Sequence, residues 1–193
     1  MKIILSRKGF DSSSKYGKVP SPIFPDNRII SLPIPDRDSP TLYKDIIWDG
    51  NEPLWQVIET LTKGKIKGSY GAHLDPDLSK KRIKREPGWK PMFGQDNIAQ
   101  GHLAKQGICK GDLFLFFGLF RDVEEGPHGL SYKKEALSKH VIWGWLEVDE
   151  IINVDSCSKA EIPWALSHPH FTPNPKIDKD PLNTVYVASD YLN

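Results

Sequence analysis

The sequence predicts an α+β fold, a single domain (residues 1–193) with a mixed, mostly antiparallel sheet or small barrel and a few short helices. Its 193 residues suit one domain. Sixteen prolines and fifteen glycines indicate short elements joined by long loops. Along the chain, one strand pattern is followed by two helical patterns and then by three more strand patterns, an order typical of α+β proteins.

The first half of the chain contains one clear strand and one clear helix. Residues 2–5 read as a short buried strand. Residues 17–40 carry six prolines, which exclude a helix and restrict any strand over residues 29–34 to a sheet edge. Residues 53–61 (PLWQVIETL) have apolar side chains at helical spacing, and Pro53 suits a first helical turn.

The second half is predicted to supply most of the sheet. Residues 63–71 are rich in glycine and lysine and predict a loop, whereas residues 97–105 predict a short helix that Asp96 could cap. Three strongly apolar segments predict strands, at residues 113–117, 140–148 and 184–188.

Composition excludes several classes of protein. Apolar residues make up 38% and charged residues 26%, as in globular domains. Cys109 and Cys157 lie far apart with no CxxC partner, so a cysteine-ligated zinc is not expected. We found no signal peptide and no apolar run long enough for a bilayer, so we expect a cytoplasmic protein without membrane contact.

Positive charge is concentrated in one segment. Residues 63–90 contain nine basic and three acidic side chains, a net charge of +6. Such a stretch can bind the phosphates of DNA or of a nucleotide, or it can be a solvated loop. The candidate phosphate contacts are Lys80, Lys81, Arg82, Lys84 and Arg85.

A polar segment follows the first strand. Ser6, Arg7 and Lys8 are joined by Asp11 and Ser12, a mixture that can hold a phosphate or a polarised carbonyl. A surface turn capped by Asp11 explains the same residues.

Three further polar clusters are candidate sites. His73, Asp75 and Asp77 alternate along the chain and would share one side of an extended segment, where an oxygen-rich metal site or a catalytic or base-contacting Asp75 is conceivable. Pro76 opposes a regular strand there, and Asp-Pro-Asp is also a common turn.

The helix at residues 97–105 carries the next cluster. Gln95 and Asn97 could bond a base edge, and His102 could act as a general acid or base. A lone helical histidine is more often structural or simply exposed.

The last cluster is His168-Pro169-His170, between Trp164 and Phe171. The two histidines could line a pocket, or they could be two zinc ligands without a third.

Aromatic residues are abundant in the predicted strands. Phe114 and Phe116 share one strand face, as do Trp143 and Trp145. Most of these rings should form the core, but Trp143 or Phe120 could stack on an unstacked base. Arg121 could stack or bind a phosphate.

Common cofactor signatures are missing. The sequence contains none of the motifs for dinucleotides, for the phosphate loop of ATP-binding proteins, for zincins or for α/β-hydrolases. We therefore assign no metal and no cofactor from the sequence.

Several long segments resemble a known family. They are LSRKGFDSSS, VPSPIFPD, SLPIPD, GAHLDPDL, PGWKPMFGQ, AQGHL, GDLFLFFGLFR, HVIWGWLEV and HPHF. Together they resemble the nucleotide modification associated domain of the third type, from Met1 to about Tyr191. The resemblance implies a role in making, altering or handling modified DNA bases, often in phage or bacterial gene clusters, without implying a particular reaction.

A second pattern resembles another group of folds. The Gly-Asp turn and the strands between Gly107 and Val148 are similar to barrels of the pseudouridine synthase and archaeosine transglycosylase type. By that similarity, residues 107–193 could form a barrel-like half that binds RNA or a flipped base.

We therefore expect an enzyme that acts on a base or modified nucleotide. The expected catalytic residues are Asp11, Asp75, His102 and His170. The expected substrate-binding residues are Ser6, Arg7, Lys8, Gln95, Arg121, Trp143 and His168. A non-catalytic reader of modified bases or RNA, and a metal-dependent nuclease built on Asp75 and Asp77, are the alternatives.

Overall fold

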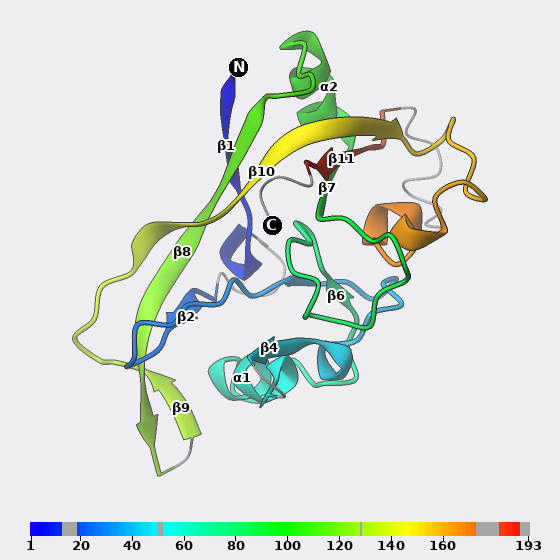
Figure 1. Cartoon of the computed structure of the whole chain (residues 1–193). Coiled ribbons are helices and arrows are strands. Elements are labelled where there is room, and N and C mark those ends of the chain that lie inside the picture. Colours follow the sequence, from blue (N-terminus) through cyan, green and yellow to red (C-terminus); the bar gives the residue numbers. More distant parts are fainter. Residues whose placement is uncertain (13–18, 50–51, 128, 173–181, 190–193) are drawn as a thin grey trace.

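The structure is a computed structural model that describes residues 1–12, 19–49, 52–127, 129–172 and 182–189. Its main feature is a mixed sheet of seven strands in the described part of the chain (Figure 1). The hydrogen-bonded order is β1-β8-β10-β11-β7, with β2 and β9 also paired to β8. The strands are β1 (Ile3–Arg7), β2 (Ser21–Ile23), β7 (Met92–Gln95), β8 (Leu113–Gly126), β9 (Gly129–Tyr132), β10 (Lys139–Asn153) and β11 (Thr184–Ala188).

Strand directions confirm a mostly antiparallel sheet. β1 and β2 run parallel to β8, whereas the pairs β8–β9, β8–β10, β10–β11 and β11–β7 are antiparallel. The order runs from β1 at one edge to β7 at the other and does not close. The expectation of a small barrel, including a barrel-like half over residues 107–193, is therefore wrong for the described residues.

Smaller elements surround the sheet. Two-stranded pairs form between β3 (Ile34–Pro35) and β6 (Ala72–His73), and between β4 (Ile47–Asp49) and β5 (Glu52–Pro53). The helices α1 (Leu54–Leu61) and α2 (Asn97–Lys105) lie at opposite ends of the molecule (Figure 1). Short 3-10 turns complete the fold: η1 (Phe10–Ser12), η2 (Tyr43–Asp45), η3 (Pro163–Ala165) and η4 (Pro169–Phe171).

Most predicted elements are present. Both helices and the strands at the start, middle and end of the chain are confirmed, but β8 and β10 extend well beyond their apolar segments. The predicted strand over residues 29–34 is reduced to an isolated bridge from Ile29 and the two-residue β3. The prolines at 33 and 35 lack the N–H groups that a longer ladder would need.

The alternation of side chains in β8 builds the centre of the core. Phe114 and Phe116 point to the same face, as predicted, and both contact the ring of Phe93 from β7. The opposite face of the sheet is largely open, and Trp145 is 56% exposed there. Trp143 does not share that face, because a register shift between Ile142 and Gly144 turns its ring inward onto Phe116. Bulges of this kind redirect side chains.

Two further apolar clusters flank the central one. One gathers α1 with the loops that precede it, and the other packs β7 and β11 against η3 and η4. The second cluster fixes the position of the His168–His170 segment against β7. None of the described helices is long and apolar enough to cross a membrane.

Candidate functional site

The carboxylate of Asp75 is the centre of a buried polar cluster. Its side chain is only 1% exposed, and its Oδ1 atom accepts a 2.7 Å hydrogen bond from the Gly94 backbone N–H. Lys8, directly after β1, places its Nζ 3.0 Å from Oδ2. The segment that carries Asp75 runs beside β7, since Asp77 and Met92 exchange backbone hydrogen bonds. Groups distant in sequence therefore meet at one carboxylate.

His73 reaches the same carboxylate from β6. Its Nδ1 lies 3.1 Å from Asp36 Oδ2, and its Nε2 lies 4.0 Å from Asp75 Oδ2. A carboxylate only accepts hydrogen bonds, so Nδ1 donates to Asp36, and in a neutral ring Nε2 is the nitrogen with the lone pair. Asp36 follows β3, the strand that pairs with β6, so the local sheet holds donor and acceptor together.

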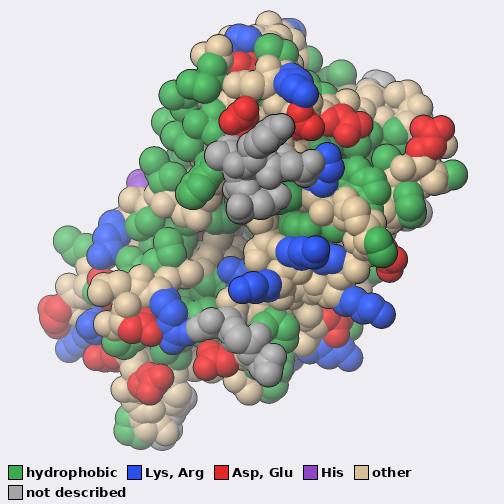
Figure 2. Space-filling model, viewed as in Figure 1, with side chains coloured by type: hydrophobic (Ala, Val, Ile, Leu, Met, Phe, Trp, Pro, Cys, Tyr) green, Lys and Arg blue, Asp and Glu red, His purple; other side chains and the backbone are tan. Residues whose placement is uncertain are grey.

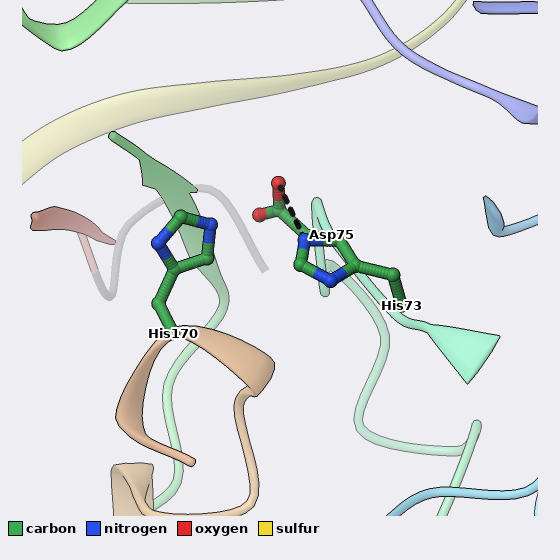
Figure 3. Close-up of side chains that lie close together, drawn as sticks. All are labelled: His73, Asp75 and His170. Carbon is green, nitrogen blue, oxygen red and sulfur yellow. Dashed lines mark ion pairs between the residues drawn. The ribbon is translucent and has the colours of Figure 1, made fainter. Parts of the chain in front are cut away.

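His170 approaches from η4 on the other side. Asn183 Nδ2 donates to the His170 backbone carbonyl at 3.1 Å, which leaves Asn183 Oδ1 to accept from His170 Nδ1–H at 2.7 Å. The Nε2 atom of His170 is therefore unprotonated. Figure 3 shows one ring nitrogen of His170 directed toward Asp75 and the other directed away.

His168 is the last member of the cluster around Asp75. The ring is fully buried, and its Nδ1 accepts from the His170 backbone N–H at 3.4 Å. Its Nε2 thus carries the proton and faces Asp75 Oδ1 at 3.2 Å, without the alignment of a hydrogen bond.

Electrostatics keep the two central groups in defined states. Burial alone would raise the pKa of Asp75, but the ammonium of Lys8 and the His168 contact hold that pKa well below its ordinary value. Burial lowers the pKa of His170 to about 4, against the opposing effect of Asp75. At neutral pH the cluster therefore combines an ionised carboxylate with a neutral imidazole.

A small cleft of about 220 Å³ opens beside Asp75. Its lining includes Gly9, Ile29, Arg82 and Trp143. The Trp143 indole is fixed by a 3.2 Å hydrogen bond to the Lys8 carbonyl. The volume is below the roughly 300–1,000 Å³ of sites for drug-sized ligands, so the cleft has room for a smaller group.

Asp77 does not join the cluster. Both of its carboxylate oxygens accept from the guanidinium of Arg85, and both side chains are buried. The expectation that His73, Asp75 and Asp77 face one side thus holds for the first two only. A nuclease centre that uses Asp75 with Asp77 finds no support in this arrangement, and Arg85 is not exposed to a phosphate.

The polar segment after β1 divides into two parts. Lys8 belongs to the Asp75 cluster, whereas Arg7 pairs with Asp11, whose Oδ1 also accepts from the Leu119 N–H. Asp11 is buried and anchors η1 to β8. Ser6 lies within β1, in register with Phe116.

The remaining predicted site residues lie away from Asp75. His102 is exposed on α2, and Gln95 ends β7 opposite Thr184. Arg121 donates to the carbonyls of Lys133 and Lys134, near the β8–β9 hairpin. The ring of Phe120 is fully buried and cannot stack on a base.

The basic segment contains both hydrogen-bonded side chains and side chains that are exposed to solvent. Arg82 donates to the Trp48 carbonyl at 2.9 Å and lines the cleft, whereas Lys80, Lys81 and Lys84 are exposed. Figure 2 shows Lys and Arg side chains across the middle of one face of the molecule.

Three residues of the cluster were missed by the sequence analysis. Asp36 and Asn183 are isolated polar residues beside short strands, and nothing in their sequence surroundings distinguishes them. Gly94 did carry a signal, because a glycine inside a strand often marks a close approach of another group. A Cβ there would lie 2.2 Å from the His170 ring.

Fold and site define an α+β protein with a buried cluster of histidines around one carboxylate, next to a small cleft. The chain belongs to the family of nucleotide modification associated domain 3, whose model matches residues 2–192. No curated protein and no solved structure matched the chain. The family resemblance seen in the sequence is therefore confirmed over nearly the whole chain.

Proposed function

We propose that the protein is an enzyme that modifies a nucleobase in a nucleotide or in DNA. The observation that carries the proposal is the convergence of Lys8 and three histidines on the buried carboxylate of Asp75 beside the cleft; the histidines are His73, His168 and His170. Titratable groups with strongly shifted pKa values that gather at a cleft are typical of active sites. The family's association with nucleotide modification supports a nucleobase as the substrate.

The cleft supplies the recognition elements. Trp143 offers an indole face on which a base can stack. Lys80 and Lys81 provide exposed positive charge on the segment that follows Asp77 and can bind phosphate.

The cluster supplies the chemical groups. Asp75 is a poor proton acceptor at neutral pH because its pKa is far below 7, so we assign it to charge stabilisation rather than to acid–base catalysis. His73 is partly exposed and lies next to Leu74 and Asp75, which line the cleft. His170 is buried behind it with a free Nε2 lone pair.

Nucleoside analysis by mass spectrometry tests this proposal. Purified protein is incubated with modified and unmodified DNA and with the small-molecule fraction of a cell extract, which supplies co-substrates. The DNA is then digested to nucleosides. We expect a changed nucleoside with the wild type and with His140→Ala, an exposed histidine of β10, and none with Asp75→Asn.

An unchanged nucleoside profile with the wild type would contradict an enzymatic role, and equal product from wild type and Asp75→Asn would contradict the role of Asp75. If DNA still bound and the binding depended on Trp143, the reader of modified bases would be the correct alternative.

A further inference from the structure

We infer that His73, Asp75 and His170 form a binding site for a divalent first-row transition metal ion. Each residue offers one ligand atom, and the three atoms lie within 4.8 Å of one another. Figure 3 shows the three side chains around a common space. They come from two segments, β6 with the residues after it and η4, which the packing against β7 brings together.

The spacing of the ligand atoms suits one ion after a small contraction. Donors about 2.1 Å from a shared ion lie roughly 3–3.4 Å apart. His73 Nε2 and Asp75 Oδ2 are 4.0 Å apart. Small side-chain rotations close that difference, and His73 is partly exposed and has room to move.

The hydrogen bonds made by the second ring nitrogen of each histidine provide the strongest argument for a metal site. Metal-bound histidines almost always donate their second ring N–H to a carboxylate or carbonyl oxygen. His73 Nδ1 is 3.1 Å from the carboxylate of Asp36, and His170 Nδ1 is 2.7 Å from the amide oxygen of Asn183. Both imidazoles therefore direct Nε2, the ligand atom of a neutral ring bonded through Nδ1–H, toward Asp75.

Asp75 is oriented in the same way. Gly94 N–H and His168 Nε2–H both face Oδ1, which leaves Oδ2 directed at His73. Oδ1 is thus held by two N–H groups, whereas Oδ2 faces His73 and is shared with the ammonium of Lys8, which a metal ion would have to displace.

The donor set selects the class of metal. Two imidazoles and one carboxylate oxygen suit Zn²⁺, Fe²⁺ or Co²⁺, whereas Mg²⁺ and Ca²⁺ prefer oxygen ligands. Three protein ligands leave coordination positions open, as in catalytic rather than structural sites.

Lys8 provides a distinguishing feature of this site. Its ammonium lies 3.0 Å from the oxygen that faces the cluster, and it also lies over the Phe93 ring at 4.4 Å. Lys8 therefore balances the charge of Asp75 when no metal is bound, and it repels an incoming cation. Removal of Lys8 should strengthen metal binding, an effect that a merely structural cluster would not show.

The metal site goes beyond the proposed function and is tested without any substrate. Full-length protein is stripped with a chelator and titrated with Co²⁺, and its visible absorption reports imidazole coordination. Zn²⁺ competition and elemental analysis give the stoichiometry. We expect one ion per chain for the wild type and His140→Ala, and none for the double variant His73→Ala/His170→Ala.

Substitutions of the residues that contact the three ligands test whether the orientation and charge of the site, rather than folding alone, determine metal affinity. Asp36→Ala and Asn183→Ala should weaken Co²⁺ binding about 10- to 100-fold. Asp36→Asn keeps an oxygen acceptor for His73 Nδ1–H and should restore most of the affinity. Lys8→Met should raise the affinity about tenfold or more, because one positive charge is removed next to the ion.

Two results would overturn the inference. One is a wild-type protein that binds neither Co²⁺ nor Zn²⁺. The other is a protein whose binding is unchanged both in Asp36→Ala and in the double histidine variant. Either result would leave the nucleoside analysis unaffected, so a failure of the metal site and a failure of the proposed function are distinguishable.

Discussion

Gly94 has no side chain because the His170 ring occupies the space next to its Cα. A Cβ would lie 2.2 Å from Cδ2 and 2.6 Å from Nε2 of that ring. The ring is itself held by Asn183 and cannot move away without loss of a buried hydrogen bond. A strand residue with an ordinary backbone conformation is thus restricted to glycine by the site alone.

Gly94→Ala should therefore destabilise the protein and displace His170. We expect a loss of about 1–3 kcal/mol in the free energy of unfolding, as for other overpacked cores. Urea denaturation measures it. Gly101→Ala in α2 is the matched control, since its Cβ would meet Leu182 at an ordinary 3.5 Å, and helix propensity makes it neutral or stabilising by up to about 1 kcal/mol. Equal losses in the free energy of unfolding of the two variants would show that the His170 ring does not restrict position 94 to glycine.

The buried pair of Lys8 and Asp75 provides a second prediction. Asp75→Asn leaves the ammonium of Lys8, only 15% exposed, without its counter-charge. We expect a loss of about 3–5 kcal/mol in the free energy of unfolding. Lys8→Met combined with Asp75→Asn should cost less than the sum of the two single changes.

A double-mutant cycle in metal-free buffer measures that difference. A coupling energy of about 1–3 kcal/mol is expected for groups in direct contact. Strict additivity would show that the two charges do not interact.

At the scale of elements, β1 is joined to the start of β8 by one carboxylate. Asp112 accepts hydrogen bonds from the backbone N–H groups of Lys2, at 2.6 Å, and Cys109, at 3.0 Å. These donors lower the pKa of Asp112 to about 2. Because Lys8 directly follows β1, this link also supports the approach of Lys8 to Asp75.

Asp112→Asn should lower the urea midpoint at neutral pH. A folded-state pKa below the unfolded value of about 3.9 stabilises the protein above that pH. That contribution is lost as the pH falls toward 2, so the difference between wild type and variant should shrink between about pH 4 and pH 2. Asp155→Asn, an exposed control, should match the wild type throughout. A difference that is constant over this range would contradict the assignment.

Local patterns predicted the elements well but not their ends or their orientation. The apolar runs in residues 113–117 and 140–148 identified β8 and β10. Both strands continue through polar residues because β8 goes on to pair with β2 and β9, and β10 goes on to pair with β11. The alternation rule placed Trp143 and Trp145 on one face. The register shift between them depends on pairing with β8, which no single segment encodes.

At the scale of the whole molecule, the site is assembled from parts that look incomplete in the sequence. His73 with Asp75, and His168 with His170, were each identified as fragments of a site. Their meeting depends on β7, which packs on both segments. Asp36 and Asn183 could not have been found, since their role arises only from the hydrogen bonds that orient the two histidines.

The distribution of charge leads to a further prediction. Lys80→Ala/Lys81→Ala should weaken DNA binding and reduce the slope of log affinity against log salt by about 2, because each contact with a phosphate releases a counterion. Lys133→Ala/Lys134→Ala removes two exposed lysines elsewhere and should change neither quantity. Fluorescence anisotropy at several salt concentrations measures both. Equal effects of the two pairs would indicate non-specific attraction.

The central claim is that a nucleotide binds in the cleft beside Asp75. Titration with single nucleotides, followed through the indole N–H signals in NMR spectra, tests it most directly. Trp143 lines the cleft, whereas Trp145 is exposed on the other face of the sheet. We predict a saturable shift of the Trp143 signal with the Trp145 signal unchanged. Saturable binding that leaves Trp143 unperturbed would contradict the account.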